Sequence, residues 1–176
     1  MDPGPYSAVG YTVDIPEGWV AQNGGQTVWK HPDAPGEVGI MPFVVKDVFA
    51  DACGPDDLLT VGPTANDLVT ALKRQHGPKT SGPTAVTLGG YPATSLRLTI
   101  PDGLDPTTCD PPIGLQIWHS APADSYMVVI DGATVTVRTA DVNGARLVLS
   151  TEAASASTPD DIAEMDAIIA SVRILP

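Results

Sequence analysis

The chain has 176 residues, of which 43% are hydrophobic and 17% charged, and this composition is typical of a folded globular domain and not of a disordered chain. Its 21 acidic residues outnumber 9 basic ones, giving a net charge of −12 and an isoelectric point near 4.3. This balance disfavours nucleic-acid backbones and anionic membrane surfaces as partners, because both attract basic patches.

The first part of the chain alternates short predicted strands with turns. Residues 11–15 alternate in polarity and end at Pro16, and residues 26–30 follow a Gly-Gly pair, so both segments favour strands. Residues 38–45 are apolar enough for a strand that is buried on both faces, although Pro42 favours an edge or a bulge. We expect residues 49–63 to be irregular.

A helix is predicted directly after Thr64. Thr64 is a good N-cap, Asp67 follows three residues later, and apolar residues recur at helical spacing. Basic residues close the last turn and Gly77-Pro78 ends the helix.

The middle of the chain predicts further β-structure. Residues 85–100 form a hairpin around Gly89-Gly90, with Ser95, Arg97 and Thr99 on the face opposite the leucines. Residues 113–119 alternate as a strand, and residues 126–130 and 134–139 flank Asp131-Gly132, which predicts a second hairpin.

The strongest local signals lie near the C-terminus. Asn143-Gly144, within residues 137–150, is typical of a type I′ turn that joins two paired strands. After a polar connection, Thr158 and Pro159 open a second helix, because Thr is a good N-cap and Pro suits the first helical position. Its apolar stripe needs a sheet face to cover, and the preceding hairpin is the nearest one.

These elements predict an α+β fold with a largely antiparallel β-sheet of about six to eight strands and two main helices packed on it. Hairpin turns dominate the connections, which is why the sheet is expected to be antiparallel. The sequence contains no internal repeat and no long linker, so we expect residues 7–176 to form a single domain.

The two cysteines, Cys53 and Cys109, each lie in a loop rich in Pro, Gly and Asp, which is a poor setting for a buried free thiol. An even number of cysteines in loops predicts a disulfide if the compartment is oxidising. The alternative is two unrelated thiols in a cytosolic protein. Two cysteines are too few for an all-thiolate zinc site, and the three histidines are not spaced as in a zinc finger.

Several turn, cap and cysteine motifs stand along the chain: Pro16-Glu-Gly-Trp19, Gly62-Pro-Thr64, Val86-Thr-Leu-Gly-Gly-Tyr-Pro-Ala93, Pro101-Asp-Gly-Leu-Asp105, Thr108-Cys-Asp110 and the final helix from Asp160. Together they resemble a group of actinobacterial envelope proteins, in which a short membrane anchor or signal precedes an extracytoplasmic domain of unknown function. The resemblance covers most of the chain from about residue 8 onward.

The family's domain is similar to the PsbP-like α/β/α sandwich, in which an antiparallel sheet lies between helices. This resemblance implies an exported protein and strengthens the expected disulfide. The sequence departs from the family because it holds no anchor segment: no apolar run is long enough to span a bilayer, and no signal peptide opens the chain. These motifs indicate a fold and no chemistry.

No catalytic motif stands out among the polar residues. His119 beside Ser120 could belong to a hydrolase site, but neighbours on a strand point to opposite faces, and no nucleophile elbow is present. Two loops gather carboxylates that could hold Ca²⁺, without the order of an EF-hand, and turn chemistry is the favoured interpretation. The carboxylates of these loops are Asp102, Asp105 and Asp110, and Asp47, Asp51, Asp56 and Asp57.

The candidate ligand-binding residues are aromatic: Trp19, Trp29, Trp118 and Tyr126. If a pocket exists, we expect it between sheet and helix near the three tryptophans, since aromatic walls with few polar groups build ligand clefts. The alternative is that each tryptophan anchors the core.

The sequence favours a non-catalytic extracytoplasmic domain that binds or senses a ligand at the cell envelope, without cofactor or metal. The alternatives are a secreted hydrolase or isomerase with a non-standard His and carboxylate site, and a structural accessory subunit. We expect an extracellular or envelope location, a monomer, and an envelope protein or small ligand as partner, with no nucleic acid.

Overall fold

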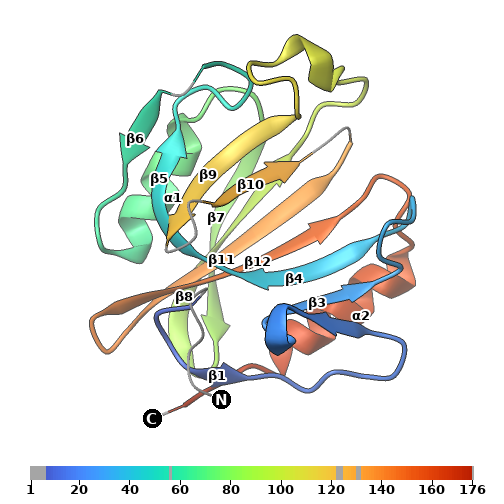
Figure 1. The fold of residues 1–176 in the computed structure, drawn as a ribbon. Helices are drawn as coiled ribbons and strands as arrows, with labels where there is room; N and C mark the ends of the chain where they lie inside the picture. Colours follow the sequence, from blue (N-terminus) through green and yellow to red (C-terminus); the bar gives the residue numbers. More distant parts are fainter. Residues whose placement is uncertain (1–6, 56, 122–124, 130–131, 176) are drawn as a thin grey trace.

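A seven-stranded antiparallel sheet is the centre of the fold (Figure 1), in a computed structural model that describes residues 7–55, 57–121, 125–129 and 132–175. Its strands lie in the order β2-β3-β4-β12-β11-β8-β7. They are β2 (Val20–Gln22), β3 (Thr27–Lys30), β4 (Val38–Pro42), β7 (Lys79–Leu88), β8 (Tyr91–Thr99), β11 (Thr134–Val142) and β12 (Ala145–Ala153).

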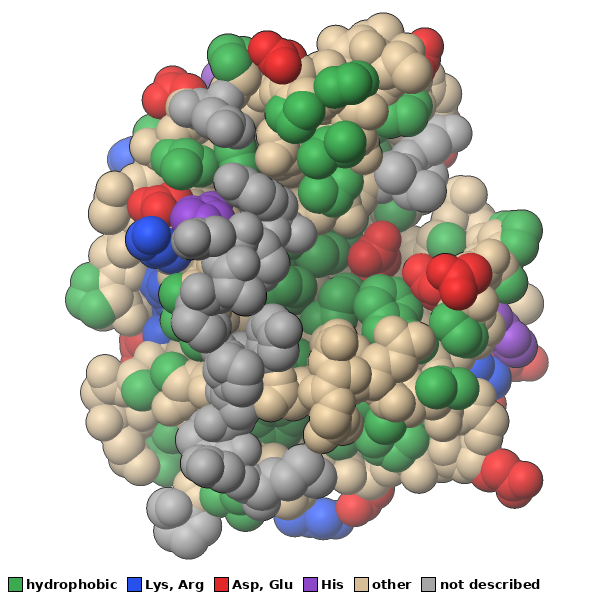
Figure 2. Space-filling view, viewed as in Figure 1, with side chains coloured by type: hydrophobic (Ala, Val, Ile, Leu, Met, Phe, Trp, Pro, Cys, Tyr) green, Lys and Arg blue, Asp and Glu red, His purple; other side chains and the backbone are tan. Residues whose placement is uncertain are grey.

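A smaller antiparallel sheet lies over one face of the first, and its strands follow the order β10-β9-β5-β6. They are β5 (Val44–Phe49), β6 (Leu58–Thr60), β9 (Leu115–Ala121) and β10 (Ser125–Val129). A two-stranded ribbon of β1 (Tyr11–Thr12) and β13 (Arg173–Ile174) joins the two ends of the described chain. Figure 2 shows that the face carrying the smaller sheet is hollowed between this sheet and β4.

The two helices cover opposite faces of the seven-stranded sheet. They are α1 (Ala65–Arg74) and α2 (Pro159–Ala170). On β12, Val148 packs with α1 and the smaller sheet, whereas Leu147 and Leu149 pack with α2. This alternation gives the sheet two apolar faces and the protein two cores. The predicted α+β class, with a largely antiparallel sheet and two main helices, is confirmed.

Both helices begin where the capping signals predict. The Thr64 hydroxyl accepts a hydrogen bond from the backbone N–H of Asp67, and the Asp67 carboxylate accepts one from the Thr64 N–H, forming a capping box. Thr158 caps α2 through the N–H of Asp161, and Pro159 stands at the first helical position. Neither helix is both long and apolar enough to cross a membrane, among the residues that the structure describes.

An ion cluster fixes the first turns of α2 against β3. The Lys30 ammonium lies 2.7 Å from Asp161 Oδ1 and 2.7 Å from Glu164 Oε2. Trp19 Nε1 also donates to Glu164 Oε2, at 3.2 Å. These hydrogen bonds hold the pKa of Asp161 at about 2, because the ammonium and the Thr158 hydroxyl stabilise the carboxylate. Asp161, in the first turn of α2, therefore binds Lys30 of β3.

The expected disulfide is present and joins the loop after β5 to the loop before β9. Cys53 and Cys109 are bonded, with Cα atoms 4.5 Å apart. Backbone bonds reinforce the link, because Asp110 N–H donates to the Cys53 carbonyl and Gln116 N–H to the Ala52 carbonyl.

Three strand predictions need correction. Residues 38–45 form two strands in different sheets, since the chain passes from β4 to β5 at Phe43, whose N–H donates to Val148. Pro42 lies beyond the reach of β3, which pairs only with residues 38–40 of β4, so its missing N–H faces a local edge. Residues 49–63 are not wholly irregular, because they contain β6, and the strand expected over residues 11–15 is limited to β1.

The hairpin expected around Asp131-Gly132 does not form as predicted. Asp131 lies outside the described residues, but β10 pairs with β9, and β11 pairs with β8 and β12. The turn signal therefore joins strands of two different sheets. The hairpin around Asn143-Gly144 is confirmed, with φ of 50° and 85° at these two residues, as a type I′ turn requires.

Replacing both Cys53 and Cys109 with Ser is expected to lower the free energy of unfolding by roughly 4 kcal/mol, because the bond closes a long loop in the unfolded chain. The sequence separation of the two cysteines is 56 residues. Urea denaturation of the variant and of the wild type measures the difference. Equal unfolding midpoints would contradict this expectation.

Gly39→Ala is expected to destabilise the protein by roughly 1–3 kcal/mol, because overpacking forces neighbouring groups to move. A Cβ at residue 39 would overlap the Trp29 ring, which lies directly on the Gly39 backbone. Thermal or urea denaturation measures the loss, and Gly10→Ala, where the added Cβ meets Leu175 at an ordinary 3.4 Å, is the control. A Gly39→Ala variant as stable as the control would show that the ring packs elsewhere.

Candidate functional site

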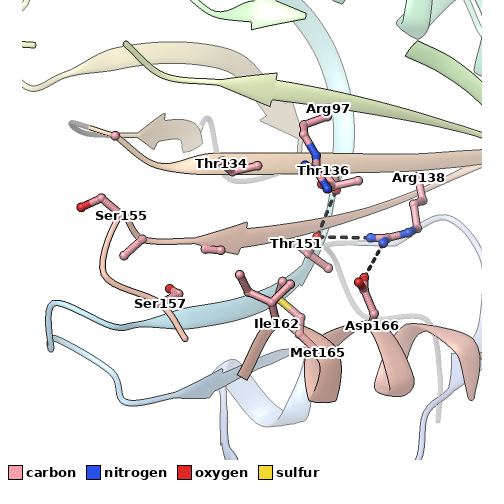
Figure 3. A pocket seen from close by; sticks show the side chains of 13 residues that line it. Arg97, Thr134, Thr136, Arg138, Thr151, Ser155, Ser157, Ile162, Met165 and Asp166 are labelled. Carbon is pink, nitrogen blue, oxygen red and sulfur yellow. Dashed lines mark hydrogen bonds and ion pairs between the residues drawn. The ribbon is translucent and has the colours of Figure 1, made fainter. Parts of the chain in front are cut away.

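A polar groove of about 220 Å³ lies between α2 and the part of the seven-stranded sheet that α2 leaves uncovered (Figure 3). Two cationic side chains, several hydroxyls and one carboxylate line it on the sheet side and at the helix, and two apolar side chains of α2 form its opposite wall. These residues are Arg97, Thr134, Thr136, Arg138, Thr151, Ser155, Ser157, Asp166, Ile162 and Met165.

Strand register brings the polar side chains together. Arg97 of β8 is paired with Thr136 of β11, and Thr136 with Thr151 of β12, so the three residues form one row across the sheet. Side chains alternate between faces along each strand, and the neighbours Leu96 and Leu98 point into the other core. The groove therefore follows from the polar positions of strands whose apolar positions are buried behind it.

Arg138 is held in a fixed position at the centre of the groove. Its Nη1 donates to Thr151 Oγ1 at 3.2 Å, and its Nη2 lies 2.7 Å from Asp166 Oδ1 (Figure 3). Burial lowers the pKa of Arg138, Asp166 opposes this effect, and the charge of Arg97 adds to it. The two guanidinium groups are thus near enough to repel each other.

The Arg97 guanidinium differs from that of Arg138, because it has no hydrogen bond or ion pair within the described residues. Figure 3 shows that its side chain extends across Thr136 toward the groove. Two arginines that converge with hydroxyl donors are suited to binding an anionic group, because the guanidinium offers several N–H donors to carboxylate, sulfate or phosphate oxygens. The described lining residues carry Ser and Thr hydroxyls and the Asp166 carboxylate, and no His or Cys is among them.

The far end of the groove is attached to β4. Ser157 Oγ donates to the Glu37 carbonyl oxygen at 2.9 Å, and the Ala154 N–H donates to the same oxygen at 3.0 Å. The turn that carries Ser155 and Ser157 is therefore held in place by backbone at the start of β4. This end of the groove is fixed by hydrogen bonds independent of α2.

The predicted aromatic residues do not converge on one pocket. Trp118 is completely buried in the core beneath the smaller sheet, with its ring 5.0 Å from that of Phe43. Trp29 packs at the margin of the same core, whereas Trp19 belongs to the core under α2 on the other face. The prediction of a single pocket near all three tryptophans is therefore wrong, because the sheet separates Trp19 from the other two.

Tyr126 pairs with His119 through the β10 and β9 backbones, and its side chain lies outside the described part of the structure. Trp118 is accounted for as a core residue, and Trp19 as a core residue that donates to Glu164. Ligand contact by any of the four aromatic residues stays a prediction.

The histidine and carboxylate that a hydrolase would need do approach each other. His119 Nδ1 lies 3.7 Å from Asp47 Oδ2, and the two residues are paired across β9 and β5. Ser120 is 1% exposed and alternates to the other face of β9, so it does not join this pair.

Asp105, from the loops considered for Ca²⁺, accepts hydrogen bonds from the N–H and hydroxyl of Thr107, which is turn chemistry.

Two carboxyl groups act on each other on the face of the sheet opposite the groove. Burial raises the pKa of Glu152 to about 7, and the negative charge of Glu37 adds to the rise. Within the described residues, neither carboxylate forms an ion pair with a cation. Sequence reasoning missed Arg138 and Glu152, because each is one polar residue in a strand pattern whose alternation shows only which face it occupies.

Comparison with known proteins gives no family. No protein-family model matches the chain, and no curated protein matches it. Among solved structures, it aligns with LpqN of Mycobacterium tuberculosis, described as involved in cell envelope biogenesis, with a TM-score of 0.47 and 18% identity over 96% of this chain and 86% of that chain. A protein from Bacteroides thetaiotaomicron aligns with a TM-score of 0.45 and 10% identity over 98% of this chain and 49% of that chain. Likenesses this weak carry no argument about function.

Stability is expected to fall as the pH rises from about 5 to 8, and Glu152→Gln is expected to remove this dependence. Because the pKa of Glu152 is about 7 in the folded protein and 4.5 is its ordinary value, the folded state binds more protons than the unfolded state between these values. The ionised carboxyl therefore costs up to roughly 3 kcal/mol above pH 7.

Thermal denaturation at several pH values measures this effect, with Glu17→Gln, at an exposed turn position, as the control. The Glu152→Gln variant should be more stable than the wild type at pH 8 and similar to it at pH 5. Parallel pH profiles for the wild type and Glu152→Gln would show that Glu152 ionises as in water.

Proposed function

We propose that residues 7–176 act as one exported, monomeric, non-catalytic domain that binds the anionic group of a ligand in the groove between α2 and the sheet. Export is supported by the Cys53–Cys109 bond, because disulfides persist in oxidising compartments and are rare in the cytosol. The sheet with helices on both faces supports the proposal of a PsbP-like sandwich in an envelope protein.

One observation carries the binding proposal: Arg97 extends toward the groove without an ion pair among the described residues, beside an Arg138 that is already held in position. The chain has only 9 basic residues against 21 acidic ones. Two of these few cations share one small groove, although their mutual repulsion has a cost. A bound anion would relieve the repulsion and accept hydrogen bonds from both guanidinium groups.

The size of the groove limits what it can hold. Its volume of about 220 Å³ is smaller than the roughly 300–1,000 Å³ of pockets that enclose drug-sized ligands. The groove therefore accommodates a carboxylate, sulfate or phosphate group and a few adjoining atoms, while the rest of a larger ligand stays outside. Ile162 and Met165 offer apolar contact to those adjoining atoms.

The secreted hydrolase is the second candidate, because His119 and Asp47 are close. It is less well supported, since the adjacent serine lies on the other face of β9. No described feature favours a purely structural accessory subunit over the binding domain.

Arg97→Gln is expected to weaken the binding of a small anion by about 10–100-fold, because a hydrogen bond to a charged group contributes about 1.5–3 kcal/mol. Isothermal titration with phosphate, sulfate and citrate at low ionic strength measures this. Arg74→Gln, at an exposed arginine in the last turn of α1, is the matched control and should bind like the wild type.

The anion that binds best should also bind more weakly as salt is added, because added ions screen the guanidinium charges. If none of the three anions binds the wild type, or if Arg97→Gln and Arg74→Gln lose the same affinity, the groove is not the anion site.

A further inference from the structure

A second cluster lies on the other face of the seven-stranded sheet, away from the arginine groove. Glu152 of β12 is paired with Gly39 of β4, and Gly39 with Trp29 of β3, so these residues form one row across three strands. Glu152 shares its face with Val148, which packs in the core beneath the smaller sheet, and Trp29 packs against the same core. The carboxyl and the indole therefore project to the same side.

The absence of a side chain at Gly39 lets the indole lie on the residue that pairs with Glu152. The Trp29 ring covers the point where a Cβ of residue 39 would stand. The ring thus lies on the β4 backbone, between its own strand and the strand of Glu152. Trp29 is half-buried, so part of the indole remains accessible.

The carboxyl groups of Glu37 and Glu152 act on each other there, without a balancing cation among the described residues. Glu37 precedes Gly39 by two residues and so shares its face, and its charge acts on Glu152. Glu37 Oε2 accepts a hydrogen bond from the Asp33 N–H, and neither Glu37 nor Glu152 has an ion pair among the described residues. Like charges near each other in a partly buried place are costly unless a positive group joins them.

The neighbouring row adds an unsatisfied hydroxyl. Ser150, two residues before Glu152 on the same face, is 0% exposed, and its Oγ has no hydrogen-bond partner within the described structure. Buried polar atoms of this kind usually have a hydrogen-bond partner. Figure 2 shows the same face hollowed between the smaller sheet and β4, with hydrophobic side chains on the floor and acidic side chains beside them.

From this geometry we propose that Trp29, Glu37 and Glu152 form a binding site for a small organic cation, an ammonium group carried on an apolar body. The indole face attracts an ammonium through its ring quadrupole, and the two carboxylates balance its charge. The hydrophobic floor of the hollow suits the apolar part of such a ligand.

A metal ion fits this place less well. Hard divalent cations need six or more oxygen ligands, and no group of three or more His, Cys, Asp or Glu side chains that could hold a metal is found within the described residues. An organic cation needs fewer oxygens, because the aromatic ring supplies part of its surroundings. The net charge of −12 also favours the approach of cations to the protein.

The test compares choline with its neutral isostere 3,3-dimethylbutan-1-ol, by isothermal titration at pH 8 on the intact disulfide-bonded protein. Choline is expected to bind at least tenfold more tightly than the isostere. Glu152→Gln and Trp29→Leu should each lower choline affinity at least tenfold, whereas Glu17→Gln should leave it unchanged. Glu152→Gln retains the fold, since it removes a charge that is unfavourable in the folded protein.

Arg97→Gln should also leave choline binding unchanged, which separates this site from the arginine groove. The proposal is overturned if choline does not bind, if choline and its isostere bind equally, or if Glu152→Gln binds choline like the wild type. None of these results depends on whether the groove on the other face binds an anion.

Discussion

The position of α2 on the sheet depends on the Lys30 ammonium. It lies between the carboxylates of Asp161 and Glu164, in the first turns of the helix, and therefore ties β3 to α2. Glu164 also accepts the Trp19 indole N–H, and Asp161 accepts the Thr158 hydroxyl. The helix is thus held over one half of the sheet face, and the apolar residues of β4, β12 and the turn end of β11 fill the space between them.

The half of the sheet face that α2 leaves uncovered is polar, because it is exposed to water. Apolar residues there would have remained exposed to water, and the strands instead present threonines and arginines on that side. Asp166, one turn after Ile162, faces this polar half and holds Arg138. The border between the covered and uncovered halves is therefore a groove with one apolar and one cationic wall. On the opposite face, the smaller sheet likewise leaves part of the surface open beside β4, the middle strand of the row formed by Trp29, Gly39 and Glu152.

Sequence reasoning predicts the features of this fold that depend on neighbouring residues. The caps at Thr64 and Thr158 and the Asn143-Gly144 turn are local, and all three are found as predicted. Strand pairing is not local, because a turn signal such as Asp131-Gly132 is equally compatible with two strands that continue into different sheets. The disulfide was predictable from loop composition and the count of two cysteines, whereas the backbone hydrogen bonds that accompany it were not.

The candidate sites were harder to predict for a related reason. Tryptophans are common in ligand sites and also in cores, and Trp118 is completely buried in the core. The arginine groove depends on the pairing of Arg97 with Thr136 and of Thr136 with Thr151, which join strands far apart in the sequence. The row of Trp29, Gly39 and Glu152 depends on the lack of a side chain at Gly39, which lets the Trp29 ring lie on the β4 backbone. The sequence does not show which ring lies there.

The most direct test of the groove is an NMR titration that follows the arginine side-chain Nε–Hε signals as citrate is added. The account predicts that the Arg97 and Arg138 signals shift together and saturate, while those of Arg74 and Arg173 remain in place. Uniform small shifts of all arginine signals without saturation would contradict it, because they would show only general screening of the positive charges.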